Sequence, residues 1–149
     1  MTTKSENAVQ YFRIGFNCSQ AVLASLGTEY NLREDDCLRL ACAFGGGMAR
    51  RQMTCGAVTG ALMVLGLKFG RARNDDISKK TETYEKANDF IKEFIKRNGS
   101  VSCRELLHGL DMNDPEEQKV IEELELFQTV CVKYVRDAVE IMQGITGRD

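Results

Sequence analysis

The chain has 149 residues, 43% of them hydrophobic, and a net charge near −2 at pH 7. A chain of this length buries about two-thirds of the surface that it exposes when unfolded, so neither a disulfide nor a metal is needed to hold the fold together. The charge balance argues against non-specific nucleic-acid binding. The longest apolar run, residues 57–67, is shorter than the roughly 20 residues of a membrane span. We therefore predict one domain, residues 1–149, without membrane insertion.

Apolar residues recur along the chain at the spacing of an α-helix, with a single proline and no alternating run typical of a strand. This pattern predicts an all-α fold, a single-domain bundle of six or seven helices. In chain order, the predicted helices cover about residues 5–16, 18–29, 34–44, 55–69, 78–97, 103–107 and 115–143.

The fourth and the last of these helices contribute most to the expected core. The fourth is apolar and carries a stripe of small residues that lets a neighbouring helix approach closely, namely Gly56, Ala57, Gly60 and Ala61. The last begins at an Asp114-Pro115 cap. A continuous apolar stripe runs along it through Leu124, Phe127, Cys131, Tyr134, Ala138 and Ile141. Cys131 is therefore predicted to face the core from the middle of one long helix.

Six cysteines are spread over the chain, at Cys18, Cys37, Cys42, Cys55, Cys103 and Cys131. The N-terminal residues carry no apolar signal core, and the only Arg-Arg pair is internal, which predicts a cytoplasmic protein with reduced thiols. No C-x-x-C motif is present, so thioredoxin-like, zinc-ribbon and ferredoxin-loop sites are disfavoured. Metal binding, redox exchange and core packing stay open, and any shared site must be assembled from separate helices.

Three cysteines each follow a residue that favours a helix N-cap, in the pairs Asn17-Cys18, Thr54-Cys55 and Ser102-Cys103. The partial positive charge of a helix start favours the thiolate and lowers a thiol pKa by about one unit at most. A strongly acidic thiol would need a further cation or a metal, and Arg50, Arg51 and Arg104 lie nearby in sequence. Their position at helix starts thus indicates that these three cysteines carry reactive or metal-ligating sulfurs. The alternative is that they are ordinary packed thiols.

Several phrases together resemble the C_GCAxxG_C_C family of redox-active proteins: residues 16–22, 44–48, 55–63 and 103–106, then Cys131 and residues 134–135. The family is named for a cysteine, a Cys-Gly-Ala-x-x-Gly element and two later cysteines, and the matching cysteines are Cys18, Cys55, Cys103 and Cys131. The resemblance implies a small helical bacterial or archaeal protein with a redox or iron–sulfur role. It also implies oxidoreductase or transporter proteins as partners. The haem-attachment pattern C-x-x-C-H is absent, so no haem is expected.

The leading hypothesis is a small electron-transfer protein in which Cys18, Cys55, Cys103 and Cys131 converge. They would act as four ligands of an iron–sulfur cluster, or as dithiol pairs in which the capped cysteines attack and Cys131 resolves. Gly56 and Gly60 would allow close approach of a cofactor near Cys55. The alternative is a non-catalytic helical partner module with a structural zinc site or merely packed thiols.

Other residues receive simpler interpretations. Cys37 and Cys42 are predicted to pack, since five positions separate them and no single helix face presents both. The only histidine, His108, is expected to be exposed, and the acidic run in residues 116–125 to be a solvated helix face. Residues 45–51, Gly-Gly-Gly-Met-Ala-Arg-Arg, are read as a loop, with an anion-binding backbone nest as the alternative. The glycine-rich fourth helix would also suit a homodimer.

Overall fold

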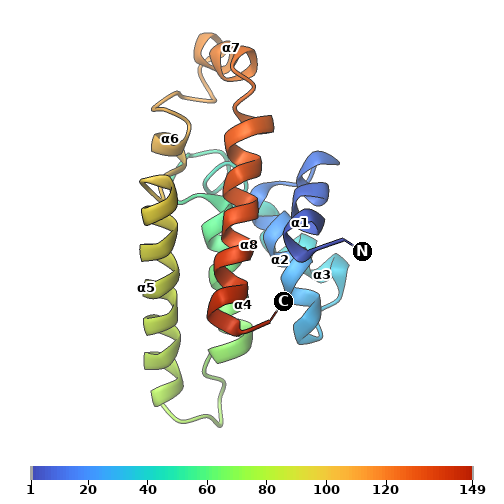
Figure 1. Cartoon of the computed structure of the whole chain (residues 1–149), viewed down its shortest axis with the longest axis vertical. Coiled ribbons are helices and arrows are strands. Elements are labelled where there is room, and N and C mark those ends of the chain that lie inside the picture. The colour runs from blue at the N-terminus through green and yellow to red at the C-terminus, as the bar shows by residue number, and fades with distance from the viewer. Residues whose placement is uncertain (1, 149) are drawn as a thin grey trace.

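The computed structural model describes residues 2–148 (Figure 1). Within that range it contains eight α-helices: α1 (Lys4–Arg13), α2 (Cys18–Gly27), α3 (Glu34–Ala41), α4 (Gly56–Phe69), α5 (Ser78–Asn98), α6 (Cys103–Leu106), α7 (Pro115–Glu123) and α8 (Val132–Thr146). Two 3₁₀ turns follow α2 and α3, at Thr28–Tyr30 and Cys42–Phe44, and a π-helical segment, Phe127–Cys131, precedes α8. The described residues form no strand, so the all-α prediction is confirmed.

The first two helices begin where the sequence provides complete caps. Thr3 and Glu6 form a capping box at α1, and Asn17 and Gln20 form one at α2. Both boxes satisfy backbone N–H groups that a helix start leaves without partners. The first helix ends at Arg13, three residues earlier than predicted, and Gly15 then takes a φ of +111°. This left-handed residue turns the chain toward Cys18.

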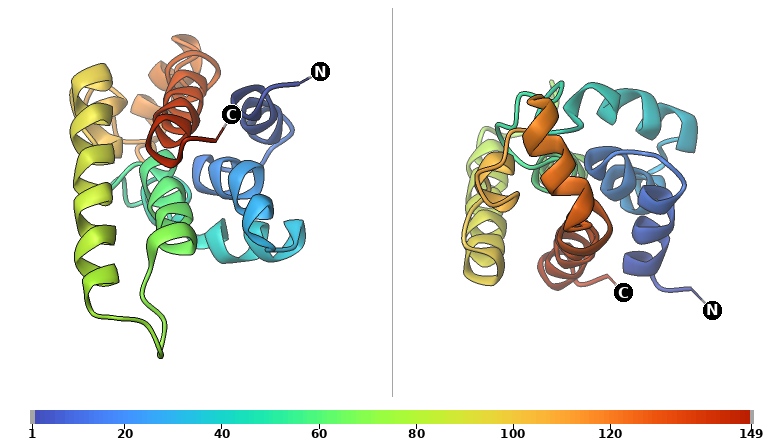
Figure 2. Two further views of the ribbon diagram at one scale, coloured as in Figure 1. Left: turned by 60° about the horizontal axis from the view of Figure 1, so that its bottom comes forward. Right: turned by 90° about the horizontal axis from the view of Figure 1, so that it is seen from above.

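Helix α4 is central, as the sequence predicts, and contacts α2, α5 and α8 (Figure 2). Its glycines permit the closest of these contacts. A Cβ at Gly60 would lie 2.7 Å from the carbonyl oxygen of Ser19, and one at Gly56 would lie 2.9 Å from the Ser19 nitrogen. Neither α4 nor any other helix between residues 2 and 148 combines the length and apolar character that crossing a bilayer requires.

Helices α5 and α8 close the other side of the bundle. Phe90 and Phe94 of α5 are fully buried, with stacked rings 6.0 Å apart between centroids. Asp137 of α8 is largely buried and receives a 3.3 Å contact from Arg97 and a 2.6 Å contact from Lys133. The two cations compensate for removing this carboxylate from water.

The prediction of one long helix over residues 115–143 is wrong. Asp114 caps it and Pro115 opens it as expected, but α7 ends at Glu123 and Glu125 takes a left-handed φ of +54°. Leu124, predicted in the core stripe, is 56% exposed, whereas Leu126 is buried. No glycine or proline marks the break, and the left-handed Glu125 shifts the register so that Leu126 is buried in place of Leu124. The core side of α8 then follows the predicted spacing, with Cys131, Tyr134, Ala138 and Ile141 buried.

Candidate functional site

Four cysteines from four separate parts of the chain line one cavity of about 170 Å³. Cys18 lies at the start of α2, Cys55 directly before α4, Cys103 at the start of α6, and Cys131 at the end of the π-helical segment. Cys55 and Cys131 are buried, and Cys18 and Cys103 are half-buried. The apolar wall includes Phe12, Leu106, Leu107, Met112, Phe127 and Tyr134. The structure thus brings together the four cysteines that the sequence singled out.

Cys55 and Cys103 meet because the segments before α4 and α6 run antiparallel. Thr54 pairs with Ser102 in an isolated β-bridge. The Cys55 N–H donates to the carbonyl of Val101 at 2.7 Å, and the Cys103 N–H donates to the carbonyl of Met53 at 2.6 Å. These bonds fix both cysteine backbones at one end of the bundle. Thr54 therefore caps no helix, since Cys55 itself occupies the cap position of α4 and the predicted Thr54 cap is wrong.

Glycines next to the cavity make room for two of the cysteines. A Cβ at Gly56 would lie 3.1 Å from the Cβ of Cys18, and a Cβ at Gly47 would lie 2.7 Å from the Cβ of Cys103. A side chain at either position would push a cysteine out of place. Gly56 and Gly47 also line the cavity, whereas Gly60 lies outside it and serves the α2–α4 contact.

The loop at residues 45–53 has an unusual left-handed backbone. Gly46 and Gly47 are followed by Met48, Ala49 and Arg50, all with φ between +50° and +71°. For residues with a Cβ, such angles cost roughly 1–2 kcal/mol each. The amides of residues 48–53 donate to carbonyls of residues 43–48, as from Ala49 to Ala43 and from Gln52 to Gly46. The segment is therefore a loop, as predicted, and an anion nest would have to use the amides of residues 45–47.

A polar clamp holds this loop against residues 110–113. The buried Gln52 side chain donates to the carbonyl of Leu110 and accepts from the N–H of Met112, both at 2.8 Å. Arg50 donates to the carbonyl of Met112 at 3.3 Å, and Asn113 donates to the carbonyl of Arg50 at 2.8 Å. Sequence reasoning missed Gln52, because no local pattern reports partners about sixty residues away.

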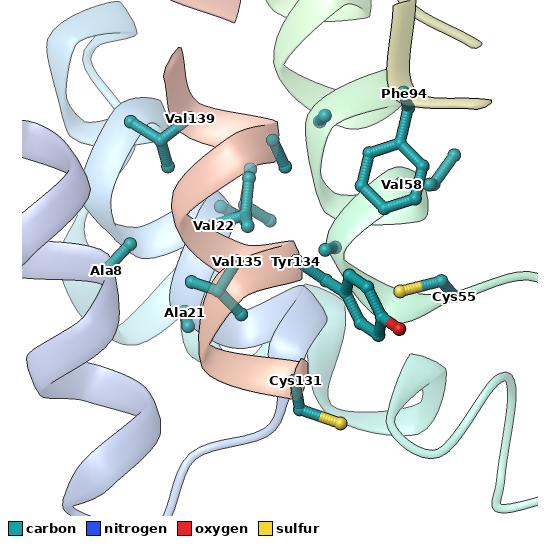
Figure 3. Packing of buried hydrophobic residues seen from close by; sticks show 14 of the residues in the cluster. Ala8, Ala21, Val22, Cys55, Val58, Phe94, Cys131, Tyr134, Val135 and Val139 are labelled. Atoms are coloured by element: carbon teal, nitrogen blue, oxygen red, sulfur yellow. The ribbon is translucent and has the colours of Figure 1, made fainter. Parts of the chain in front are cut away.

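Tyr134 separates the cysteines on the α8 side of the cavity. In Figure 3 its ring lies between the labelled side chains of Cys55 and Cys131. Its hydroxyl donates to the carbonyl of Leu106 at 2.8 Å, which fixes the ring against α6. Burial first, and then the neighbouring cysteine thiols, raise the pKa of Tyr134 to about 12. The ring is therefore a neutral wall of the cavity at physiological pH.

The pKa values of Cys18, Cys55 and Cys103 are raised, which contradicts the lowering expected from a helix start. A hydrogen bond with Cys131, followed by burial, raises the pKa of Cys18 well above its ordinary value. Burial raises the pKa of Cys55 to about 12, outweighing the amides of Ala57 and Val58 that act in the opposite direction. Burial and the nearby Cys131 likewise raise the pKa of Cys103 to about 12, although Arg50 acts to lower it. A helix end contributes only about 0.3–1 kcal/mol, which desolvation exceeds here.

The four thiols limit the kinds of metal group that the cavity could hold. Four thiols match the ligands of an iron–sulfur cluster or of tetrahedral zinc. Among residues 2–148, however, no three Cys, His, Asp or Glu side chains are grouped closely enough to hold a single ion. The described residues therefore show the donor types that either group needs, without a preformed single-ion site.

The remaining candidates lie outside this cavity. Cys37 is fully buried, as predicted, and its sulfur would lie 3.0 Å from a Cβ at Gly27. Cys42 is exposed on a 3₁₀ turn, so its predicted packing role is wrong. His108 is exposed just after α6, as expected. The acidic residues of the 116–125 run are mostly exposed and do not line the cavity.

An all-α bundle with four thiols around one cavity defines a small cysteine-centred protein. The sequence profile of the C_GCAxxG_C_C family, described as "Putative redox-active protein (C_GCAxxG_C_C)", matches residues 16–145, and the chain belongs to this family. The family name spells Gly-Cys-Ala-x-x-Gly, which corrects the Cys-Gly-Ala-x-x-Gly order given above for the family element; this chain reads Cys55-Gly56-Ala57-x-x-Gly60, with the first two residues in the opposite order.

One relative extends the comparison to an archaeon. A protein of Archaeoglobus fulgidus, described as an uncharacterized protein, is 24% identical over 132 residues, which cover 84% of this chain and 81% of the relative. No solved structure matches the chain.

Proposed function

We propose that the protein is a thiol redox protein in which Cys18 and Cys131 cycle between two thiols and one disulfide. The observation that carries this proposal is that both thiols line one cavity together with Cys55 and Cys103, and the neighbouring Cys131 is the main cause of the raised pKa of Cys18. A disulfide needs Cβ atoms roughly 3.5–4.5 Å apart, a separation that cysteines around one small cavity can reach. Membership of a family described as redox-active supports the same conclusion.

The oxidation removes two electrons and two protons from the pair. One thiol attacks a disulfide of the oxidant and releases one of its sulfurs as a thiol. The second thiol of the pair then attacks the mixed disulfide, giving the Cys18–Cys131 bond and a second released thiol. Electrons thus pass from the protein dithiol to the oxidant disulfide, and the reverse sequence reduces the protein. Cys55 and Cys103, held by the Thr54–Ser102 bridge, line the same cavity beside this pair.

Thiol counting and peptide mapping test the proposal. Reduced, metal-free protein is treated with a disulfide oxidant, and its free thiols are counted before and after. We expect the count to fall by two, a Cys18–Cys131 crosslink in the peptide map, and full recovery with dithiothreitol. Cys18→Ser should abolish the crosslink, whereas Cys42→Ser, at an exposed position outside the cavity, should leave it intact. An unchanged count, or crosslinks that exclude Cys131, would contradict the proposal.

An iron–sulfur cluster is a second candidate, favoured by four thiol donors around one cavity. Cys18, Cys55, Cys103 and Cys131 would be the ligands, and a cluster held there would supply one-electron transfer. Iron and acid-labile sulfide in protein purified without oxygen, both lost in Cys55→Ser, would support it. Zinc in place of iron and sulfide would support a structural zinc site. Metal-free protein would contradict the cluster and agree with the dithiol function.

The electron partner is part of the same proposal. Family resemblance points to an oxidoreductase or a transporter protein, and the recessed sulfurs mean that a partner must extend a group into the cavity. Covalent trapping tests this point. With Cys18 or Cys131 replaced by serine, the second attack is blocked, so a mixed disulfide with a protein partner should accumulate. Trapping through Cys42 alone would contradict a partner that uses the cavity.

A further inference from the structure

A second hollow, which we call the outer groove, adjoins the thiol cavity. Its volume is about 440 Å³, and it shares Phe12, Arg50 and Phe127 with the cavity wall. Arg13 and Gln128 line its outer part. The groove and the cavity are therefore adjacent, with these three side chains forming walls of both. Small-molecule sites typically occupy roughly 300–1,000 Å³, and the volume of the groove, without the cavity, falls in this range.

The charged side chains that line these two hollows all have one sign. Arg50 and Arg13 are the charged residues lining the groove and the cavity, and no acidic residue lines either. Neither arginine forms an ion pair with any residue in the range 2–148. Arg50 uses one nitrogen for the Met112 carbonyl, and a guanidinium carries five N–H donors. Two aromatic side chains, Phe12 and Phe127, lie next to these unneutralised cations.

We propose that the outer groove binds a low-molecular-weight disulfide carrying carboxylates and directs its S–S bond to the Cys18–Cys131 pair. This inference rests on the proposed dithiol function and names its substrate class. Arginine pairs well with carboxylates, because its planar fork matches their two oxygens. The apolar walls exclude water from the body of the ligand, and a small molecule enters such a recess without the extended group that a protein partner needs.

The reaction balances without another reagent. One thiol of the pair attacks the bound disulfide RSSR, giving a protein–S–SR mixed disulfide and one RSH. The second thiol displaces the remaining RS group as RSH and completes the Cys18–Cys131 bond. The carboxylates keep their charge throughout, so they act in binding and orientation. The product thiols keep the carboxylates and their negative charge, and an oxidising reaction elsewhere would return them to the disulfide, whereas a reductant would return the Cys18–Cys131 bond to two thiols.

Probes of different charge test the substrate class. The protein is used reduced and metal-free in a Cys42→Ser background, so that the exposed thiol does not react. The probes are 3,3′-dithiodipropionate with two carboxylates, 2-hydroxyethyl disulfide with no charge, and cystamine with two ammonium groups. Each rate is divided by the rate of the same probe with 2-mercaptoethanol, an uncharged thiol, so that the normalisation carries no charge preference of its own. We expect the dianion to react about ten-fold faster than the neutral probe at low salt, and cystamine slowest.

Matched variants assign this preference to the groove. Arg13→Gln and Arg50→Gln should each reduce the advantage of the dianion, whereas Arg51→Gln, an exposed neighbour lining neither hollow, should keep it. Arg13 lies outside the left-handed loop, so Arg13→Gln tests the role of the groove even if Arg50→Gln alters that loop. Equal normalised rates for the three probes, or an equal effect of Arg51→Gln, would overturn the substrate class alone. If no probe lowers the thiol count by two, the dithiol function fails with it.

Discussion

The two ends of this bundle are built by different means. Where α4, α5 and α8 pack together, regular helices bury apolar side chains such as Phe90, Leu65 and Val139. At the cysteine end, the backbone includes a left-handed loop, a short helix and a π-helical segment, and polar side chains clamp it in place. Cores fill space, whereas a cavity must be kept open against collapse. The comparison indicates that the irregular backbone is what maintains the cavity.

The largest expected effect is in the regular region. Replacing the fully buried Phe90 by alanine should lower the free energy of unfolding by about 3–5 kcal/mol, because the ring leaves a cavity that the helices cannot close. Urea unfolding measures the change. Ile95→Ala on the same helix, at a position 40% exposed, should cost far less. Similar losses for both variants would mean that α5 contributes little to a packed core.

Gly47→Ala tests the irregular end. Gly47 has a φ of +70°, and a Cβ there would lie 2.7 Å from both the Cβ of Cys103 and the Met53 nitrogen. Left-handed strain and overpacking together should cost about 2–4 kcal/mol. Thermal unfolding measures this loss. Gly144→Ala, with nothing within 4 Å of the new Cβ, is the matched control and should be neutral or slightly stabilising.

The polar clamp should contribute less than the glycine. Gln52→Ala leaves the buried N–H of Met112 and the carbonyl of Leu110 without their side-chain partner, at a cost of about 1–3 kcal/mol. We also expect Cys103 to become more accessible, measured by its alkylation rate against that of exposed Cys42. If stability falls while the alkylation ratio stays constant, the clamp does not shape the cavity.

The smallest predicted effect is a pH dependence of the reduced, metal-free protein. In the unfolded chain a thiol loses its proton above an ordinary pKa of 9.0, whereas folded Cys55 keeps its proton until about 12. The folded state binds more protons in that window, so the free energy of unfolding should fall as pH rises above 9. At pH 10 the loss from Cys55 is on the order of 1 kcal/mol. Cys55→Ser, which does not titrate there, should show a shallower decline.

The same contrast explains what the sequence could predict. Helical periodicity and the caps at Asn17, Asp114 and Ser102 are local signals, and the structure confirms all three caps. The left-handed angles of Met48 to Arg50 and of Glu125 fall on residues that usually avoid them, so no local rule marks them. The raised thiol pKa values also depend on burial among residues far apart in sequence. Cysteine identity was therefore predictable, whereas cysteine chemistry was not.

The position of the cavity also has a consequence for how the chain folds during its synthesis. Its four cysteines are spread from α2 to the segment before α8, so its walls meet only after nearly the whole chain has been synthesised. Contacts this distant in sequence form later than the helices that carry them. Until then, Cys18, Cys55 and Cys103 are exposed thiols without the burial that keeps them protonated in the finished fold. The wrong sulfurs are therefore most easily joined by oxidation while the chain is being synthesised, before the cavity has formed.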